Sequence, residues 1–107
     1  MNRGDLVTVA LPEDYGKPRP ALVIQSDLFE GHPSITLLPI TSELRETPLF
    51  RITVEPTKEN GLQKKSQVMV DKAHTVAREK LSQPFGKLDE VLLLSINRAL
   101  VLFLGFA

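Results

Sequence analysis

The sequence predicts a mainly β fold: a small barrel-like antiparallel sheet of about five to seven strands, with short helices and one C-terminal helix packed outside it. Short β-rich segments recur along the chain, connections rich in proline, glycine and asparagine separate them, and one long apolar segment closes the chain. The 107 residues suffice for one domain, 1–107, with one core, and are too few for two.

The first half of the chain predicts three strands. Residues 6–11 are rich in β formers, and residues 12–18 are dense in breakers and predict an exposed loop, where binding residues often collect. Residues 21–25 predict the second strand, and the apolar run 21–24 within it indicates burial on both faces. Residues 34–40 predict a third strand, in which Pro39 indicates an edge position or a bulge.

The second half predicts shorter elements. Two hydroxyls followed by a carboxylate at residues 41–43 indicate a cap that opens a short helical turn. Residues 49–54 and 67–70 predict the fourth and fifth strands. Residues 75–76 favour a brief sixth strand or a turn, and residues 77–81 one helical turn.

Residues 88–104 predict the one long helix, with Asp89 and Glu90 favourably placed in its first turn. Polar side chains are scarce along the rest of it, so the helix should be largely buried, either against the sheet or in a partner. An apolar helix and unprotected edge strands together predict a homodimer.

Composition excludes several classes of protein. The chain has no cysteine, so it has neither disulfides nor thiolate metal sites, which fits a reducing compartment. No histidine or acidic cluster has metal-ligand spacing, and no cofactor fingerprint is present, so we expect no metal and no cofactor. The N-terminus lacks the apolar region of a signal peptide, and the longest apolar stretch, 99–104, is too short for a membrane span.

The formal net charge is zero. A nucleic-acid binder with this balance needs its basic residues gathered on one face.

Arg19 is the first candidate functional residue. It lies between Pro18 and Pro20, which limit its backbone freedom at the start of a buried strand. A guanidinium held in this way suits recognition of a phosphate. The alternative is an arginine in an ordinary turn that leads into the strand.

Several polar residues near strand ends are further candidates. Thr41 could donate its hydroxyl to a phosphate oxygen, although it or Ser42 could equally be a helix N-cap. Lys64 and Lys65 precede Ser66, which flanks the predicted fifth strand. With Lys17 and Arg19 across a groove they would form a track for phosphates, whereas a lysine pair at a loop tip is commonly only solvated surface.

Histidine is the usual acid or base near neutral pH, and the chain has two, His32 in a turn and His74 after the fifth strand. Stacking on a nucleobase would use Tyr15, the only tyrosine, or a phenylalanine such as Phe29 or Phe50, because the chain has no tryptophan.

The ordered segments resemble the MazF/PemK toxin family over almost the whole chain. They are residues 3–7, 17–25, 38–42, 61–62, 66–71 and 75–76, with a helix ending near Gly105. The resemblance implies an SH3-like β-barrel that forms a homodimer. It also implies a cytoplasmic toxin of a type II toxin–antitoxin system whose partner is an antitoxin with a disordered acidic tail.

The activity that the resemblance implies is cleavage of single-stranded RNA, usually messenger RNA, at a short sequence and without a metal. A 2′-hydroxyl attacks the adjacent phosphate and leaves 2′,3′-cyclic phosphate and 5′-hydroxyl ends. The family's catalytic arginine and threonine map onto Arg19 and Thr41. His74 is the candidate base. The candidate RNA contacts are Tyr15, Lys17, Ser42, Lys64, Lys65 and Ser66.

The chain departs from the family pattern at three places. It lacks a tryptophan common on the first strand, its loop 12–18 looks short, and His74 stands where many members have arginine. Two alternatives therefore stay open: a non-nuclease toxin that resembles CcdB and binds DNA gyrase through its C-terminal helix, and a catalytically silent homologue that binds only the antitoxin or DNA.

Overall fold

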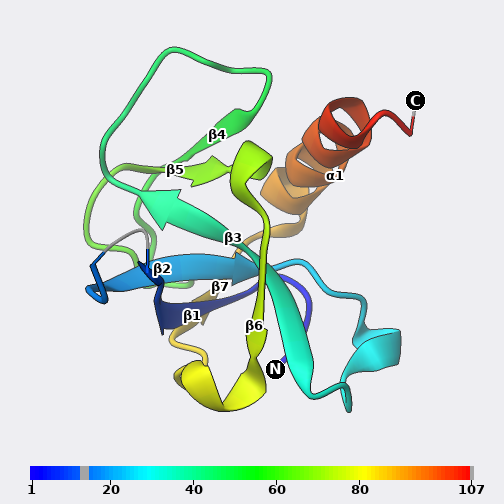
Figure 1. Cartoon of the computed structure of the whole chain (residues 1–107). Helices are drawn as coiled ribbons and strands as arrows, with labels where there is room; N and C mark the ends of the chain where they lie inside the picture. Colours follow the sequence, from blue (N-terminus) through cyan, green and yellow to red (C-terminus); the bar gives the residue numbers. More distant parts are fainter. Residues whose placement is uncertain (13–14, 107) are drawn as a thin grey trace.

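The computed structural model describes residues 1–12 and 15–106. Within them the chain forms a seven-stranded sheet, short 3-10 helices and one α-helix (Figure 1). In chain order the elements are β1 (Asp5–Ala10), β2 (Pro18–Val23), η2 (Asp27–Phe29), β3 (Ser34–Thr41), β4 (Arg51–Val54), β5 (Ser66–Met69), η3 (Val70–Lys72), β6 (His74–Ala77), η4 (Arg78–Lys80), β7 (Gly86–Lys87) and α1 (Glu90–Leu104).

The strands pair antiparallel in the order β4-β5-β3-β2-β1-β7, and β6 pairs with β3 off this path. β3 is the central strand: it pairs with β2 along one edge, and with β6 and then β5 along the other. The predicted small antiparallel sheet with a helix outside it is confirmed. α1 lies beside β4 and η3 at one end of the molecule (Figure 1).

The prediction that Pro39 places its strand at an edge or a bulge is wrong. Pro39 is buried and in regular register with Ala21 of β2. The Ile24 amide donates to the Thr36 carbonyl, so even-numbered residues of β3 turn their backbone groups toward β2 and Pro39 turns away from it. On that side β6 pairing ends at Leu37 and β5 pairing begins at Ile40. The missing amide of Pro39 therefore falls where no strand needs it.

Apolar residues are buried on both faces of the sheet, in two clusters and not in the single core predicted. Leu22 belongs to the cluster under α1, whereas Ala21 and Val23 belong to the cluster on the opposite face. The prediction that this run is buried on both sides is confirmed. Because successive strand residues point to opposite faces, a continuous apolar run is what such a strand requires.

Short elements differ most from the prediction. No helical turn follows Thr41: residues 42–45 are bends and irregular chain. β6 forms where a strand or a turn was predicted, and η4 forms at the predicted helical turn. The two-residue β7 and the three-residue η2 were not predicted, because elements this short carry no periodic pattern.

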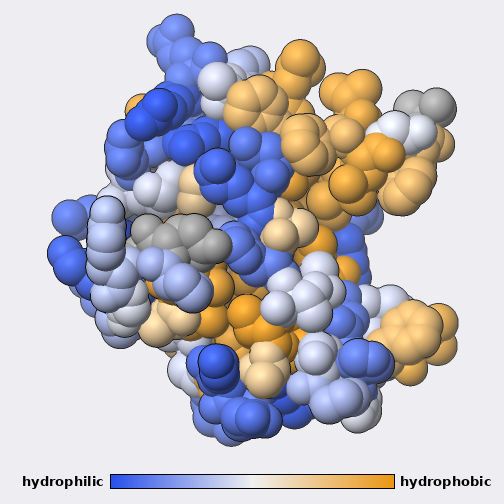
Figure 2. Space-filling model, viewed as in Figure 1, coloured by the Kyte–Doolittle hydropathy of each residue, from blue (hydrophilic) through white to orange (hydrophobic). Residues whose placement is uncertain are grey.

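α1 is less covered than predicted. Asp89 is its N-cap and accepts a hydrogen bond from the Leu92 amide at 2.8 Å; the helix ends at Gly105. Within the helix only Ile96 and Ala99 are fully buried. Large apolar side chains of its outer side are exposed and form the apolar surface over α1 in Figure 2. They include Val91, Leu94, Val101, Leu102, Phe103 and Leu104.

The sheet therefore covers one side of α1 only, and a partner surface would have to cover the other. Across the described residues, no helix has the length and apolar character that a membrane crossing needs.

Candidate active site

Two adjoining hollows share Arg19 and Ile40. The larger, which we call the Phe85 groove, has a volume of about 480 Å³ and is lined by Thr8, Pro18, Arg19, Pro20, Ile40, Ser42, Gly61, Leu62, Gln63, Lys64, Ser66 and Phe85. The smaller, which we call the His74 pocket, has a volume of about 280 Å³ and is lined by Leu11, Arg19, Pro39, Ile40, Thr41, Glu43, Arg51, Met69, Lys72 and His74.

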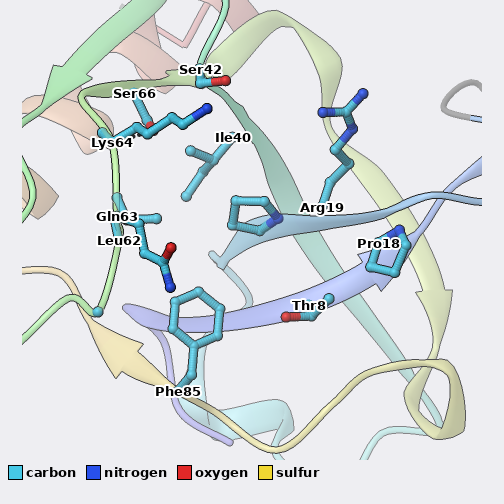
Figure 3. Close-up of a pocket in the computed structure, with 12 residues that line it drawn as sticks. Thr8, Pro18, Arg19, Ile40, Ser42, Leu62, Gln63, Lys64, Ser66 and Phe85 are labelled. Carbon is cyan, nitrogen blue, oxygen red and sulfur yellow. Dashed lines mark hydrogen bonds between the residues drawn. The ribbon is translucent and has the colours of Figure 1, made fainter.

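Arg19 stands on the ridge between the two hollows. It lies in β2 opposite Val9 of β1, and its side chain is exposed. Figure 3 shows the guanidinium at one side of the groove, whereas the Lys64 side chain enters from the opposite wall and ends over Ile40. The rigid backbone that Pro18 and Pro20 suggested from the sequence is realised here as a strand, because both prolines lie within β2.

Thr41 ends β3 and is paired with Gln67 of β5. Its Oγ1 accepts a hydrogen bond from the Glu43 amide at 3.1 Å. The cap-like bond predicted for this residue therefore forms, but it closes a turn and opens no helix. A hydroxyl that accepts one hydrogen bond can still donate its own proton, and Thr41 lines the same pocket as Arg19 and His74.

Two side chains from neighbouring strands hold the turn after Thr41. Gln67 is only 7% exposed; its Oε1 accepts from the Arg45 amide and its Nε2 donates to the Arg45 carbonyl, both at 2.9 Å. Arg51 of β4 donates to the Glu43 carbonyl at 2.8 Å and to Gln67 Oε1 at 3.2 Å. The backbone from 43 to 45 is thus fixed at several points.

Glu43 is the one carboxylate on the described lining of the His74 pocket. Arg45 donates to its Oε1 at 2.7 Å, and this hydrogen bond, with the charge of the same guanidinium, lowers the pKa of Glu43. The carboxylate is therefore ionised and partly neutralised by Arg45.

His74 opens β6 and is paired with Leu37 of β3, which leaves its half-buried side chain on the pocket wall. Lys72, from η3, lines the same wall. Arg19, Arg51 and Lys72 give the described lining three permanent positive charges against Glu43. An anionic group is the ligand that such a pocket favours.

A loop built around Asn60 forms one wall of the Phe85 groove. The buried Asn60 accepts from the amides of Thr57 and Leu62, and it donates to the Glu55 carbonyl at 2.9 Å. Gly61, at φ +70°, turns the chain next to it. This Asn-Gly turn supports the wall that carries Gln63 and Lys64.

A close backbone contact joins this loop to β7. A Cβ atom added at Gly86 would lie 2.2 Å from the Asn60 carbonyl oxygen, a distance that only glycine permits. The amide of Lys87 donates to the Glu59 carbonyl at 3.0 Å, and the amide of Phe85 donates to the Leu6 carbonyl at 2.9 Å. Phe85 therefore stands at a fixed place between β1 and the loop.

The predicted site residues fall into three groups. Arg19, Thr41 and His74 share the His74 pocket, and Ser42, Lys64 and Ser66 line the Phe85 groove with Arg19. The Ser66 hydroxyl donates to the Lys64 carbonyl at 2.8 Å, so it also supports the loop. The candidates outside the described lining of both hollows are Tyr15, Lys17 and Lys65.

Those three candidates lie elsewhere. Tyr15 is 94% exposed in the loop 12–18, of which residues 13 and 14 lie outside the described part of the chain. Lys17 precedes β2 and is exposed. Lys65 forms an ion pair with Glu55 at 3.5 Å.

Sequence reasoning missed Arg51, Lys72, Gln63 and Phe85. The first three look like ordinary surface residues in sequence, and only the pairing of β4 with β5 brings Arg51 to the pocket. Phe85 had a signal, because an aromatic residue between Pro84 and Gly86 has no regular core strand to belong to. Within the described residues, no group of three or more histidine or acidic side chains could hold a metal ion.

Comparison with known proteins agrees with this architecture. The model of the PemK-like, MazF-like toxin of type II toxin–antitoxin systems matches residues 2–104. The probable endoribonuclease MazF of Mycolicibacterium smegmatis is 44% identical over 100% of this chain and 99% of its own length. Endoribonuclease MazF9 of Mycobacterium tuberculosis is 28% identical over 97% of this chain and 96% of its own.

A solved mycobacterial endoribonuclease in complex with its cognate antitoxin superimposes with a TM-score of 0.84 at 19% identity, covering 100% of this chain and 97% of that one. The fold is therefore shared across low identity. With the family model matched over nearly the whole chain and a close relative aligned from end to end, this chain belongs to the PemK-like, MazF-like toxins of type II toxin–antitoxin systems.

Proposed function

We propose that this toxin is a metal-independent endoribonuclease that cleaves single-stranded RNA, messenger RNA above all, at a short sequence in the cytoplasm. The observation that carries the proposal is that Arg19, Thr41 and His74, far apart in sequence, line one pocket with a positive balance of charge. The 44%-identical relative, named a probable endoribonuclease, supports the same reaction.

The proposed reaction starts with attack of a 2′-hydroxyl on the adjacent phosphorus. His74 takes the proton of that hydroxyl, and the bond between phosphorus and the 5′-oxygen breaks. A solvent water molecule protonates the departing 5′-oxygen, so that a 2′,3′-cyclic phosphate and a 5′-hydroxyl result. The pentacoordinate phosphorane carries extra negative charge. The Arg19 guanidinium, which stays protonated, stabilises this charge, and the Thr41 hydroxyl donates to a phosphate oxygen.

The test is cleavage of a long single-stranded RNA by the purified protein in EDTA, with both new ends mapped. Loss of one charge-stabilising donor typically costs about two to three orders of magnitude in rate, so Arg19→Ala should cleave at least about 100-fold more slowly. Arg98→Ala removes an exposed arginine from α1, outside the described lining of either hollow, and should cleave normally. Equal rates for wild type and Arg19→Ala would defeat the assignment.

We further propose an antitoxin with a disordered acidic tail as the protein partner, and a homodimer as the working form. The positive lining of the two hollows would accept acidic side chains, and a solved neighbour of the same fold is an endoribonuclease in complex with its cognate antitoxin. The exposed apolar side of α1 is the surface that a second copy would cover.

A second candidate function is binding of DNA gyrase without nuclease activity. It is favoured by the exposed apolar residues in the last turn of α1 and just after it, among them Phe103 and Phe106. A supercoiling assay separates the two functions: inhibition of gyrase together with intact RNA would favour this candidate.

A further inference from the structure

The two hollows beside Arg19 differ in chemistry. The His74 pocket carries cations from three elements, which suits a phosphate. The Phe85 groove has mainly apolar walls, formed by Pro20, Ile40, Leu62 and Phe85, with single polar groups at its rim. A hollow of this kind usually receives a flat apolar group whose edge makes a few hydrogen bonds.

The Phe85 ring is presented for stacking. Phe85 as a residue is 41% exposed, although its backbone is fixed by the hydrogen bond to Leu6. A Cβ atom added at Gly61 would lie 3.0 Å from the ring carbon Cδ1, so the absence of a side chain there lets the ring pack closely on the loop. Figure 3 shows the ring at the end of the groove away from Lys64.

Polar groups stand around this ring at the edge of the groove. Figure 3 shows the Gln63 side-chain amide next to Phe85, with the Thr8 hydroxyl on the β1 side. A glutamine amide both donates and accepts, so it can pair with the edge of a nucleobase. Lys64 and Arg19 extend from opposite walls of the same groove (Figure 3) and can contact two successive phosphates.

From this arrangement we propose that the Phe85 groove is a nucleobase subsite for the nucleotide next to the cleaved phosphate, with Phe85 as its stacking platform and Gln63 as the residue that reads the base. The inference rests on the proposed ribonuclease function. It assigns part of the sequence preference to the loop after β4 and to the segment before β7, and so to residues outside the loop 12–18.

The test compares cleavage of a randomised RNA pool by wild type and variants. Phe85→Leu should lower kcat/KM by about 10- to 100-fold, the size expected for loss of one stacked base, and Phe85→Trp should retain activity within about threefold. Gln63→Leu should abolish preference at one position beside the cut and leave the other positions unchanged. Phe29→Leu is the matched control, because Phe29 is exposed in η2 and lies outside the described groove lining.

Binding of a 2′-O-methyl oligonucleotide, which cannot be cleaved, separates this inference from the ribonuclease proposal. A protein that binds the oligonucleotide through Phe85 but cuts no RNA would defeat the proposed function and uphold the subsite. A protein that cuts RNA with unchanged rate and sequence preference in both Phe85→Leu and Gln63→Leu would overturn the subsite. Weakened antitoxin binding with unchanged RNA cleavage in Phe85→Leu would likewise overturn it, in favour of a peptide site.

Discussion

Replacement of Gln67 by leucine tests whether the turn that carries Thr41 depends on one buried amide. Leucine has a similar volume but removes the partners of the Arg45 amide and carbonyl and of the Arg51 guanidinium. A net neutral hydrogen bond contributes about 0.5–1.5 kcal/mol and a charged one about 1.5–3 kcal/mol. Because water reaches the exposed Arg45, we expect the free energy of unfolding to fall by about 3 kcal/mol.

Urea denaturation measures this loss directly. With a slope of about 1.5 kcal/mol per molar for a domain of this size, the midpoint should fall by about 2 M. Gln83→Leu makes the same chemical change at an exposed position and should leave the midpoint within about 0.3 M, since surface substitutions usually have small effects. Gln67→Glu keeps the acceptor for Arg45 and Arg51, so its urea midpoint should lie between those of Gln67→Leu and Gln83→Leu.

Activity gives a second readout of the same variant. The turn positions Thr41 for the proposed reaction and is not expected to bind the rest of the RNA. Gln67→Leu should therefore lower kcat by about 10- to 100-fold with little change in KM. A midpoint shift under about 0.5 M together with an unchanged kcat would refute the reasoning, and would mean that water replaces the amide at no cost.

Three further perturbations follow from the structure. Gly86→Ala should destabilise the fold by about 3 kcal/mol, because the added Cβ atom would overlap the Asn60 carbonyl. The measurement is the melting temperature, and an unchanged value would show that the loop moves to make room for the Cβ atom. Leu102→Glu, on the exposed side of α1, should convert a homodimer to a monomer in light scattering, and an unchanged mass would exclude that side as the interface. Glu43→Gln should lower stability slightly at neutral pH. Since Arg45 lowers the pKa of Glu43 from 4.5, the difference from wild type should vanish as the pH falls through that lowered value, and a difference that persists in acid would contradict the ion pair.

The strands that sequence could predict are those with a period or a breaker at each end. The unbroken apolar run that begins at Ala21 is the sequence pattern of a strand buried on both faces, and the structure divides its residues between two clusters. The prediction for Pro39 was wrong because the sequence shows only that a proline has no backbone N–H group. Whether that amide is needed depends on where β6 ends and β5 begins, which is a property of the assembled sheet.

The residues of the candidate site likewise fall into those with a local signal in the sequence and those whose partners meet only in the assembled sheet. Arg19 could be recognised because its two flanking prolines are local constraints, and Thr41 because it follows a strand. Gln67 gave no such signal, since its partners lie about twenty residues away and meet it only through the pairing of β3, β4 and β5. Stacking was expected from Tyr15, Phe29 or Phe50. Phe50 instead packs against the core, and among the phenylalanines the described groove lining contains Phe85.

The charge around Arg19 has a consequence for how this protein meets RNA. The described lining of the two hollows includes four lysines and arginines and one carboxylate, while the whole chain has thirteen basic and thirteen acidic residues. Nine basic and twelve acidic residues are therefore left for the remainder, which is net negative. At physiological salt, mobile ions screen both sets of charges beyond a Debye length of about 8 Å. In the proposed function, the positive lining would therefore attract RNA only at close range, because a chain with a formal net charge of zero adds no long-range attraction.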